Sequence, residues 1–272
     1  MELGLPICVT CGVQYGGKRP DCPICLDERQ YVGWAGQQWT TLAQLRAAGH
    51  RGRIQEEGPG VVGVGVTPPI AIGQRALLLR DPGGNVLWDM ITYIDDEMIA
   101  QVSELGGVSA IAVSHPHFYG SMIEWAHAFD APVYIHEKDR EWVARPDGSV
   151  VFWAGDTREI GDGLTLINAG THFDGGQVLH SAGAQDGAGL LLSGDIFTVA
   201  QDRRWVGFMY SYPNHIPERP RAIRRALALI EPLRFDRVYG AWWGRIVHTD
   251  GAAAVRRSAE RYFSFALDDQ QP

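Results

Sequence analysis

The sequence Ser-Ala-Ile-Ala-Val-Ser-His-Pro-His-Phe-Tyr-Gly occupies residues 109–120 and is the most informative stretch of the chain. It starts with a short apolar run, Ser109–Val113, which is typical of a buried strand, and two histidines follow that strand directly. In layered α/β folds, ligands gather at the carboxyl ends of strands. Side chains two residues apart on an extended segment point the same way, and Pro116 stiffens the segment. We therefore expect His115 and His117 to share one metal ion.

Two further strand-like runs end in a side chain that binds metals. Leu164–Asn168 leads to His172, and Leu190–Ser193 leads to Asp195. Together with the histidine pair, four such side chains follow three strands. Three imidazoles and a carboxylate from separate loops make a site suited to zinc or iron. We expect the metal centre at this point of the fold.

The rest of the chain reads as many strands first and then strands alternating with helices, which implies sheets covered by helices. Residues 49–60 are polar, charged and Gly-rich, and are interpreted as a linker or surface loop. Further strands are expected at Val61–Val66, Ala76–Arg80, Asn85–Met90, Pro132–Ile135, Val150–Trp153, Gln177–His180 and Arg237–Tyr239. Helices are expected at Thr41–Ala48, from Asp95 or Asp96 to Leu105, at Ser121–Phe129, from Lys138, at Arg221–Ile230 and at Gly251–Leu267.

All four cysteines of the chain lie within its first 25 residues, at Cys8, Cys11, Cys22 and Cys25. A two-residue gap lets the two thiolates of one tight turn face a single ion, and two such turns complete a tetrahedron around zinc. Two disulfides are the alternative, which the absence of an export signal disfavours. A closed four-thiolate site leaves no position for substrate. We therefore predict a structural zinc that serves folding, or docking of a protein partner or a second copy.

Composition narrows the classes of function. The chain has 272 residues, 45% of them hydrophobic, and a net charge of −8. An acidic protein with no basic block is a poor nucleic-acid binder. No apolar run reaches the ~18 residues that cross a bilayer, and the first residues have no basic and apolar leader. We expect a cytoplasmic protein that binds neither nucleic acid nor membrane and acts on a small molecule.

The order of these motifs resembles the metallo-β-lactamase superfamily. The resemblance rests on Asn85-Val86-Leu87-Trp88-Asp89, Ser114-His115-Pro116-His117, Gly170-Thr171-His172 and Ser193-Gly194-Asp195, and covers roughly residues 59–248. It implies a four-layer αββα sandwich of the α/β class, with one or two metals between the sheets. His115, His117 and His172 match the three-histidine site, and Asp195 matches the carboxylate that bridges to a second metal. Asp89 matches the aspartate that orients the histidine loop.

The same resemblance has a gap where the second metal would bind. The family pattern His-x-His-x-Asp-His has Tyr119 and Gly120 at its last two positions here. The last strand leads to Trp242 and Trp243 where the family has a histidine, and His248 comes several residues later. A mononuclear site is therefore predicted. His215 lies on a loop that could roof the pocket, and the aromatic residues around these loops favour an uncharged or aromatic substrate.

These features predict a metal-dependent hydrolase of a small ester, lactone, thioester or amide. A three-histidine zinc keeps a position for water and lowers its pKa towards ~7. Asp195 is predicted to bind the metal or hold that water, and Tyr119 to donate a hydrogen bond to the developing oxyanion. Two alternatives stay open: an iron enzyme of the oxygenase type, and a ligand-binding protein without catalysis. The predicted parts are a zinc knuckle at 1–30, a helix and linker at 31–58, and the metallo-β-lactamase-like domain at 59–272.

Overall fold

The computed structural model describes residues 1–184 and 186–266. The chain divides into two compact units, Met1–Trp153 and Ala154–Pro272. Among the described residues, no helix has both the length and the apolar character needed to cross a bilayer. Each unit is a mixed sheet with its own helices, so the α/β class predicted from the sequence is confirmed.

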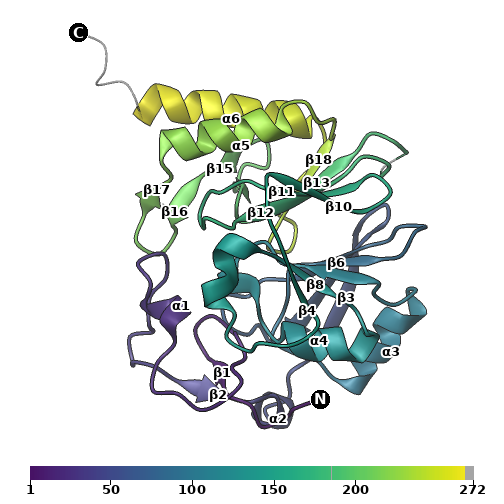
Figure 1. Cartoon of the computed structure of the whole chain (residues 1–272), viewed down its shortest axis with the longest axis vertical. Coiled ribbons are helices and arrows are strands. Elements are labelled where there is room, and N and C mark those ends of the chain that lie inside the picture. The colour runs from purple at the N-terminus through teal and green to yellow at the C-terminus, as the bar shows by residue number, and fades with distance from the viewer. Residues whose placement is uncertain (185, 267–272) are drawn as a thin grey trace. The chain divides into compact units, whose positions relative to one another are not determined.

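The first unit is built on a seven-stranded sheet, in the order β3-β4-β5-β6-β7-β8-β9. Neighbours from β3 to β6 are antiparallel, and those from β6 to β9 are parallel. Parallel neighbours need crossover connections, and helices supply them. Figure 1 shows α3 and α4 on the same side of this sheet. The elements are β3 (Arg51–Gly58), β4 (Val61–Thr67), β5 (Ala76–Leu79), β6 (Val86–Trp88), α3 (Asp96–Glu104), β7 (Ala110–Ala112), α4 (Met122–Phe129), β8 (Val133–His136), the 3₁₀ helix η2 (Glu137–Trp142) and β9 (Val150–Trp153).

The helices of this unit begin and end where their cap residues dictate. The Asp95 carboxylate accepts the Met98 backbone N–H at 2.8 Å, so α3 begins there, and Met98 and Val102 form its buried face. Helix α4 ends at Asp130, which adopts a left-handed conformation with φ of 50°. The buried apolar side chains of α3 and α4 lie on the face that packs against the sheet, as their helical spacing predicts.

The interpretation of residues 49–60 as a linker was wrong, because β3 occupies most of them. The strand is an edge strand of the sheet, and its first residues alternate between exposed and half-buried. Polar residues are typical of a protected sheet edge, which is why they resembled a loop. Gly52 has a packing role, since a Cβ there would lie 2.4 Å from Met98 Cγ. The polar strand β10 (Thr157–Gly161) of the second unit was missed for the same reason.

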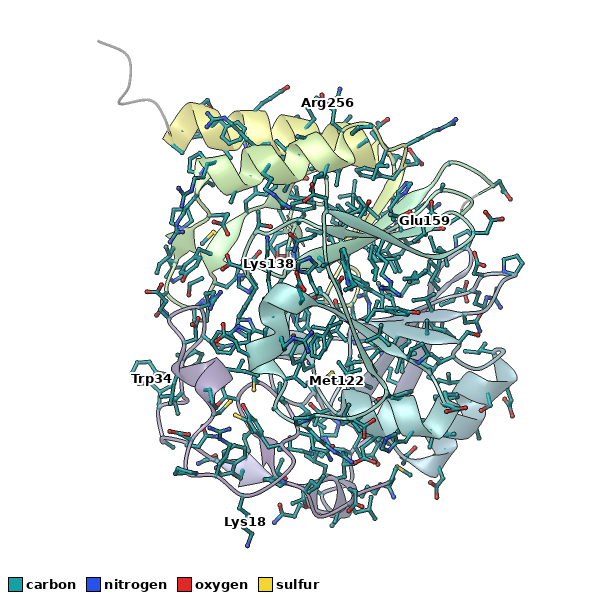
Figure 2. The ribbon with its side chains drawn as sticks, viewed as in Figure 1. Lys18, Trp34, Met122, Lys138, Glu159 and Arg256 are labelled. Atoms are coloured by element: carbon teal, nitrogen blue, oxygen red, sulfur yellow. The ribbon has the colours of Figure 1, made fainter. Side chains whose placement is uncertain are left out.

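The cysteines lie in an N-terminal part of the first unit, which holds short elements only. Thr41 caps the predicted helix by accepting the Gln44 N–H at 3.2 Å. Trp34 points into solvent and is fully exposed (Figure 2). The protein contact predicted for this region stays a prediction. The elements are β1 (Ile7–Cys8), α1 (Pro23–Leu26), β2 (Trp39–Thr40) and α2 (Leu42–Ala47), and β1 pairs with β2.

The second unit is a six-stranded sheet in the order β10-β11-β12-β13-β18-β19, with two helices that lie side by side over it (Figure 1). Apolar side chains of both helices and of the central strands form one core, since these helices are amphipathic. The remaining elements are β11 (Leu164–Asn168), β12 (Gln177–Ser181), β13 (Leu190–Gly194), α5 (Pro220–Ile230), β18 (Arg237–Gly240), β19 (Ile246–Val247) and α6 (Gly251–Ala266), with the ribbons β14 (Thr198–Val199) with β15 (Val206–Gly207) and β16 (Met209–Ser211) with β17 (Ile216–Pro217).

Candidate metal centres

The four cysteines form one compact cluster. Cys8 and Cys25 Sγ lie 3.6 Å apart, Cys11 and Cys22 Sγ lie 3.7 Å apart, and all four sulfurs lie within 4.8 Å of one another. A disulfide needs about 2.05 Å. A tetrahedral ion with Zn–S bonds of about 2.3 Å needs sulfurs about 3.8 Å apart. The cluster therefore has the dimensions of a four-thiolate zinc site.

The surroundings of the cluster also fit a cation held by thiolates. Burial raises the pKa of the Cys11 thiol well above its ordinary value, and a bound metal cation would stabilise its ionised form. The Tyr15 hydroxyl lies 3.0 Å from Cys22 Sγ, and the Gln37 amide donates to Cys8 Sγ at 3.3 Å. Such donors stabilise negative charge on sulfur. Sequence reasoning missed both, because neither lies within a Cys-x-x-Cys motif.

His115 and His117 lie together at the carboxyl end of β7, and both are buried. Their ring centroids are 5.0 Å apart. The extended geometry predicted for the His-Pro-His segment was wrong. Residues Pro116–Phe118 form a 3₁₀ turn that begins directly after His115. Proline favours the first position of a helical turn, so Pro116 brings the two imidazoles together by turning the chain.

The loop that carries the pair is tied to the sheet by Asp89. The Asp89 carboxylate accepts the Ser114 backbone N–H at 2.8 Å, and the Ser114 hydroxyl lies 2.9 Å from His115 Nδ1. Burial raises the pKa of Asp89 to about 7, against hydrogen bonds from Ser114 that lower it. Metal-binding histidines are generally held through their other ring nitrogen. This chain of contacts orients His115 so that Nε2 is the nitrogen we expect to bind an ion.

In the second unit, His172 follows β11 and is buried. Its Nδ1 lies 3.1 Å from the Met209 carbonyl oxygen, so a proton on Nδ1 leaves Nε2 as the ligand atom. His172 has a φ of 64°, a left-handed conformation that costs a residue with a Cβ about 1–2 kcal/mol. Its backbone N–H donates to the Glu218 carboxylate at 2.7 Å, and this bond holds the strained residue in place.

Asp195 follows β13 and is also buried. Tyr212 connects it to His172: its hydroxyl donates to the Asp195 carbonyl oxygen at 2.7 Å, and its ring centroid is 5.5 Å from that of His172. Burial raises the pKa of Tyr212 well above its ordinary value, and the Asp195 carboxylate raises it further. Tyr212 is therefore a neutral donor. The second unit thus brings one imidazole and one carboxylate to a common aromatic residue.

Tyr119 and Gly120 show why the loop lacks a second set of ligands. A Cβ on Gly120 would lie 2.6 Å from the Ile91 carbonyl oxygen, and the residue has a φ of 47°. A histidine does not fit at this position in this backbone. Tyr119 is buried, and its hydroxyl donates to the Asp139 carbonyl oxygen at 3.4 Å. Burial raises its pKa well above the ordinary value. Its role as an oxyanion donor stays a prediction.

We expect Gly120→Ala to destabilise the protein by about 2–4 kcal/mol, because it combines a clash with backbone and a left-handed conformation. Thermal unfolding of the variant measures this. Gly17→Ala is the matched control, since nothing lies within 4 Å of a Cβ at Gly17. Equal melting temperatures for the two variants would contradict this description of the loop.

The other predicted site residues are exposed or half-buried, unlike the buried histidines and Asp195. His215 is exposed at the turn between β16 and β17, and Trp242 and Trp243 are half-buried after β18. His248 is exposed as well. Strand β19 pairs antiparallel with β18, with Val247 opposite Val238, so His248 lies towards the amino end of β18. Since the site residues follow the carboxyl ends of strands, His248 is not placed to join them.

Glu218 is the functional candidate that sequence reasoning missed. Its carboxylate is buried and accepts the N–H groups of His172 and Arg219, both at 2.7 Å. We expect Glu218→Leu to leave the His172 N–H buried without an acceptor, which costs about 1–3 kcal/mol. Glu218→Gln keeps an acceptor oxygen and should lose less. Metal titration and thermal unfolding of both variants check this. Equal behaviour of the leucine variant and the native protein would contradict the role.

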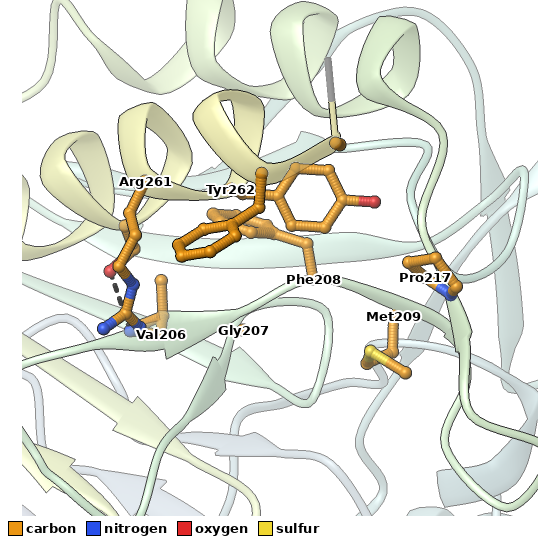
Figure 3. Close-up of a pocket in the computed structure, with 10 residues that line it drawn as sticks. Val206, Gly207, Phe208, Met209, Pro217, Arg261 and Tyr262 are labelled. Atoms are coloured by element: carbon orange, nitrogen blue, oxygen red, sulfur yellow. Dashed lines mark hydrogen bonds between the residues drawn. The ribbon is translucent and has the colours of Figure 1, made fainter. Parts of the chain in front are cut away.

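A pocket of about 410 Å³ lies on the second unit, between α6 and the ribbons β14–β15 and β16–β17. Its walls are mostly apolar, and Figure 3 shows Phe208, Met209, Pro217 and Tyr262 around it. None of the predicted metal ligands lines it. One of its lining residues is connected to His172 through Glu218. The Tyr262 hydroxyl donates to the carbonyl oxygen of Glu218, whose carboxylate accepts the His172 backbone N–H.

Comparison with known proteins shows which family the chain belongs to. No family model matches it. The uncharacterized protein YmaE of Bacillus subtilis strain 168 is 48% identical over 260 residues, which are 94% of this chain and 94% of YmaE. The chain belongs to the same family as YmaE. The likeness spans nearly all of both proteins, so most of each unit is included.

Solved structures show the fold that this YmaE-family chain adopts. The metallo-β-lactamase VMB-1 has a TM-score of 0.57 and 14% identity, over 79% of this chain and 98% of its own. DIM-1 metallo-β-lactamase exposed to ceftazidime has a TM-score of 0.56 and 15% identity, over 78% and 98%. A motif mutant of the Cronobacter sakazakii enzyme has a TM-score of 0.51 and 20% identity, over 81% and 99%. The metallo-β-lactamase fold predicted for the YmaE-family chain is confirmed.

Proposed function

We propose that the protein is a metal-dependent hydrolase that binds one ion through His115, His117 and His172, and that Asp195 binds the same ion or holds the attacking water. The observation that carries the proposal is the buried histidine pair, with ring centroids 5.0 Å apart, at the end of β7. Burial of a polar ring nitrogen costs free energy unless the nitrogen is bonded, and one shared metal ion would satisfy both imidazoles. The metallo-β-lactamase names of the structurally similar proteins point to the same chemistry.

The donor set fits zinc and also ferrous iron. His115 and His172 are each contacted at Nδ1, by the Ser114 hydroxyl and the Met209 carbonyl, so both present Nε2. That arrangement is the usual one for histidines that bind metal. Three imidazoles and a carboxylate suit either ion, and we favour zinc because the proposed reaction is a hydrolysis. When bound, such an ion polarises a carbonyl oxygen and makes water a nucleophile near neutral pH.

The chain's own residues orient the reacting groups and exclude bulk water. Asp195 accepts a proton from the attacking water or holds that water in place. Tyr212, kept neutral by burial, fixes the Asp195 backbone by its hydrogen bond. Phe118 and Phe173 pack beside the histidines, and apolar walls of this kind lower the local dielectric. These surroundings favour a small uncharged or aromatic ester, lactone, thioester or amide over a polyanion.

A mononuclear site is favoured by the loop after the histidine pair. Gly120 cannot accept a side chain in this conformation, and Tyr119 is directed towards the Asp139 carbonyl. The two positions that would hold a second ion thus supply no ligand. We therefore expect two metal ions per chain, one at the histidines and one at the cysteines.

Metal analysis and a substrate panel test the proposal together. The purified protein should contain two zinc ions per chain and hydrolyse at least one member of a panel of aryl esters, lactones and thioesters. The turnover should disappear after dialysis against a chelator and return with zinc. Iron at the histidines, with oxygen consumption, would support the oxygenase alternative instead. Full occupancy without any turnover on the panel would favour a ligand-binding protein.

A further inference from the structure

The N-terminal cysteine region is bonded directly to the loop that carries His115 and His117. The Gln14 backbone N–H, which lies between the two Cys-x-x-Cys motifs, donates to the Gly120 carbonyl oxygen at 2.9 Å. The Thr92 hydroxyl donates to the Gly12 carbonyl oxygen at 2.8 Å, directly beside Cys11. Both bonds join residues of the first unit. They connect the cysteine cluster to both chain segments that meet at the histidine loop, because Ile91, next to Thr92, packs against Gly120.

A charged network reinforces this connection. The Gln14 side chain accepts a hydrogen bond from Arg145 at 2.6 Å, and the same Arg145 nitrogen donates to the Glu124 carboxylate at 2.5 Å. Glu124 lies in the first turn of α4, the helix that directly follows the histidine loop, and its side chain is 1% exposed. A buried carboxylate is stable only when it is paired and hydrogen-bonded. Correct placement of Gln14 and Arg145 therefore stabilises the start of α4.

The contact region is tightly packed, so a displacement on one side reaches the other. The space between Val13, Gln14, Tyr119, Gly120 and Arg145 leaves only about 10 Å³. Gly12 has a φ of 80°, and a Cβ there would lie 2.2 Å from the Thr92 hydroxyl. Close packing of this kind transmits shifts because few voids absorb them. The conformation of residues 8–25 thus fixes the carbonyl of Gly120 and the loop that ends there.

We propose that the cysteine-bound metal controls the histidine loop, with Thr92 and Gln14 as positioning residues. The metal joins the two cysteine turns, and without it these turns lose the common ion that keeps the four sulfurs together. Loss of that metal releases the Gln14–Gly120 and Thr92–Gly12 bonds. The histidine loop then becomes mobile and binds its own ion less tightly. The binding part of this inference rests on the proposed function, whereas the mobility of the loop does not.

Hydrogen exchange tests the mobility of the loop in the full-length protein. Removal of the cysteine-bound metal, by Cys11→Ser, should raise amide exchange in residues 115–124 at least tenfold. The second unit should keep its native exchange, which shows that the protein stays folded. If the second unit is also deprotected, Thr92→Val replaces Cys11→Ser as the deciding variant, since it deletes one hydroxyl and keeps the size of the side chain. Unchanged exchange in residues 115–124 in the deciding variant would overturn the inference.

Competition titration with a chelator tests the binding part, with Thr92→Val against its matched control Thr92→Ser. Serine keeps the hydroxyl that donates to Gly12. The valine variant should keep one metal at the cysteines and bind the second about tenfold more weakly than the native protein, in the range that outer contacts of metal sites contribute. The serine variant should bind within twofold of the native protein. Equal affinities for valine and serine variants would overturn the coupling. A native protein that binds metal only at the cysteines would overturn the proposed function, and hydrogen exchange would then decide the present inference.

Discussion

His117→Ala is expected to remove the ion from the histidine site and to abolish hydrolysis, while the cysteine-bound metal remains. His117 is buried beside His115, and alanine supplies no ligand atom. Because His117 is a proposed direct ligand, the loss of affinity should exceed the roughly 10–100-fold effect of removing an outer contact. Metal analysis should fall from two ions per chain to one, and turnover on the substrate panel should fall to background.

His127→Ala is the matched control for this variant. His127 lies on α4 with an exposed side chain, and its Nε2 lies 3.0 Å from the Asp147 carboxylate. The control should retain two metals and turnover within twofold of the native protein, with a small loss of stability from a surface pair. A His117→Ala protein with two metals and native turnover would remove His117 from the site.

Cys11→Ser is expected to have the largest effect on stability. Cys11 is fully buried within the cluster, and serine cannot replace a thiolate as a zinc ligand. Structural zinc contributes about 10–16 kcal/mol in isolated zinc peptides, and part of that energy stabilises the first unit here. We expect a loss of several kcal/mol, which for a chain of this size lowers the Tm by roughly 10 °C or more. Calorimetry together with zinc analysis measures both consequences.

Val9→Ser controls for the introduction of serine into the same turn. Val9 is 38% exposed and offers no ligand atom, so its replacement should change stability by about 0.5 kcal/mol or less. The control should retain the cysteine-bound metal. A Cys11→Ser protein with the native Tm and two bound ions would show that the cluster is not a four-thiolate site.

Much of the fold was predictable because apolar periodicity and caps report it directly. The predicted strands Val150–Trp153 and Leu164–Asn168 have the bounds seen in the structure, and Asp95 caps α3 as the sequence indicates. The polar edge strands β3 and β10 were missed because packing against a neighbouring strand, which is not encoded locally, decides their structure. Strand β3 is the clearest case, since its polar residues resemble those of a loop and Gly52 is explained only by Met98 in α3.

In the candidate site, too, local motifs were predictable and contacts between distant residues were not. The histidines and the cysteines were found because their spacing is a chemical signature. The 3₁₀ turn at Pro116–Phe118 was not predicted, because proline is compatible with both extended and helical backbone. Glu218 was missed because it lies 46 residues from the His172 that it holds. Thr92 and Gln14 were missed for a similar reason, since they act through backbone groups distant in the chain.

Anomalous diffraction at the zinc and iron edges, on a crystal of the native protein, would identify the bound metals and locate their ligands together. We expect two peaks per chain at the zinc edge, one among Cys8, Cys11, Cys22 and Cys25 and one contacted by His115, His117 and His172. A second ion at the histidine site would contradict the mononuclear assignment. Histidines too far apart to contact a common ion, in a folded chain with metal at its cysteines, would contradict the proposed function itself.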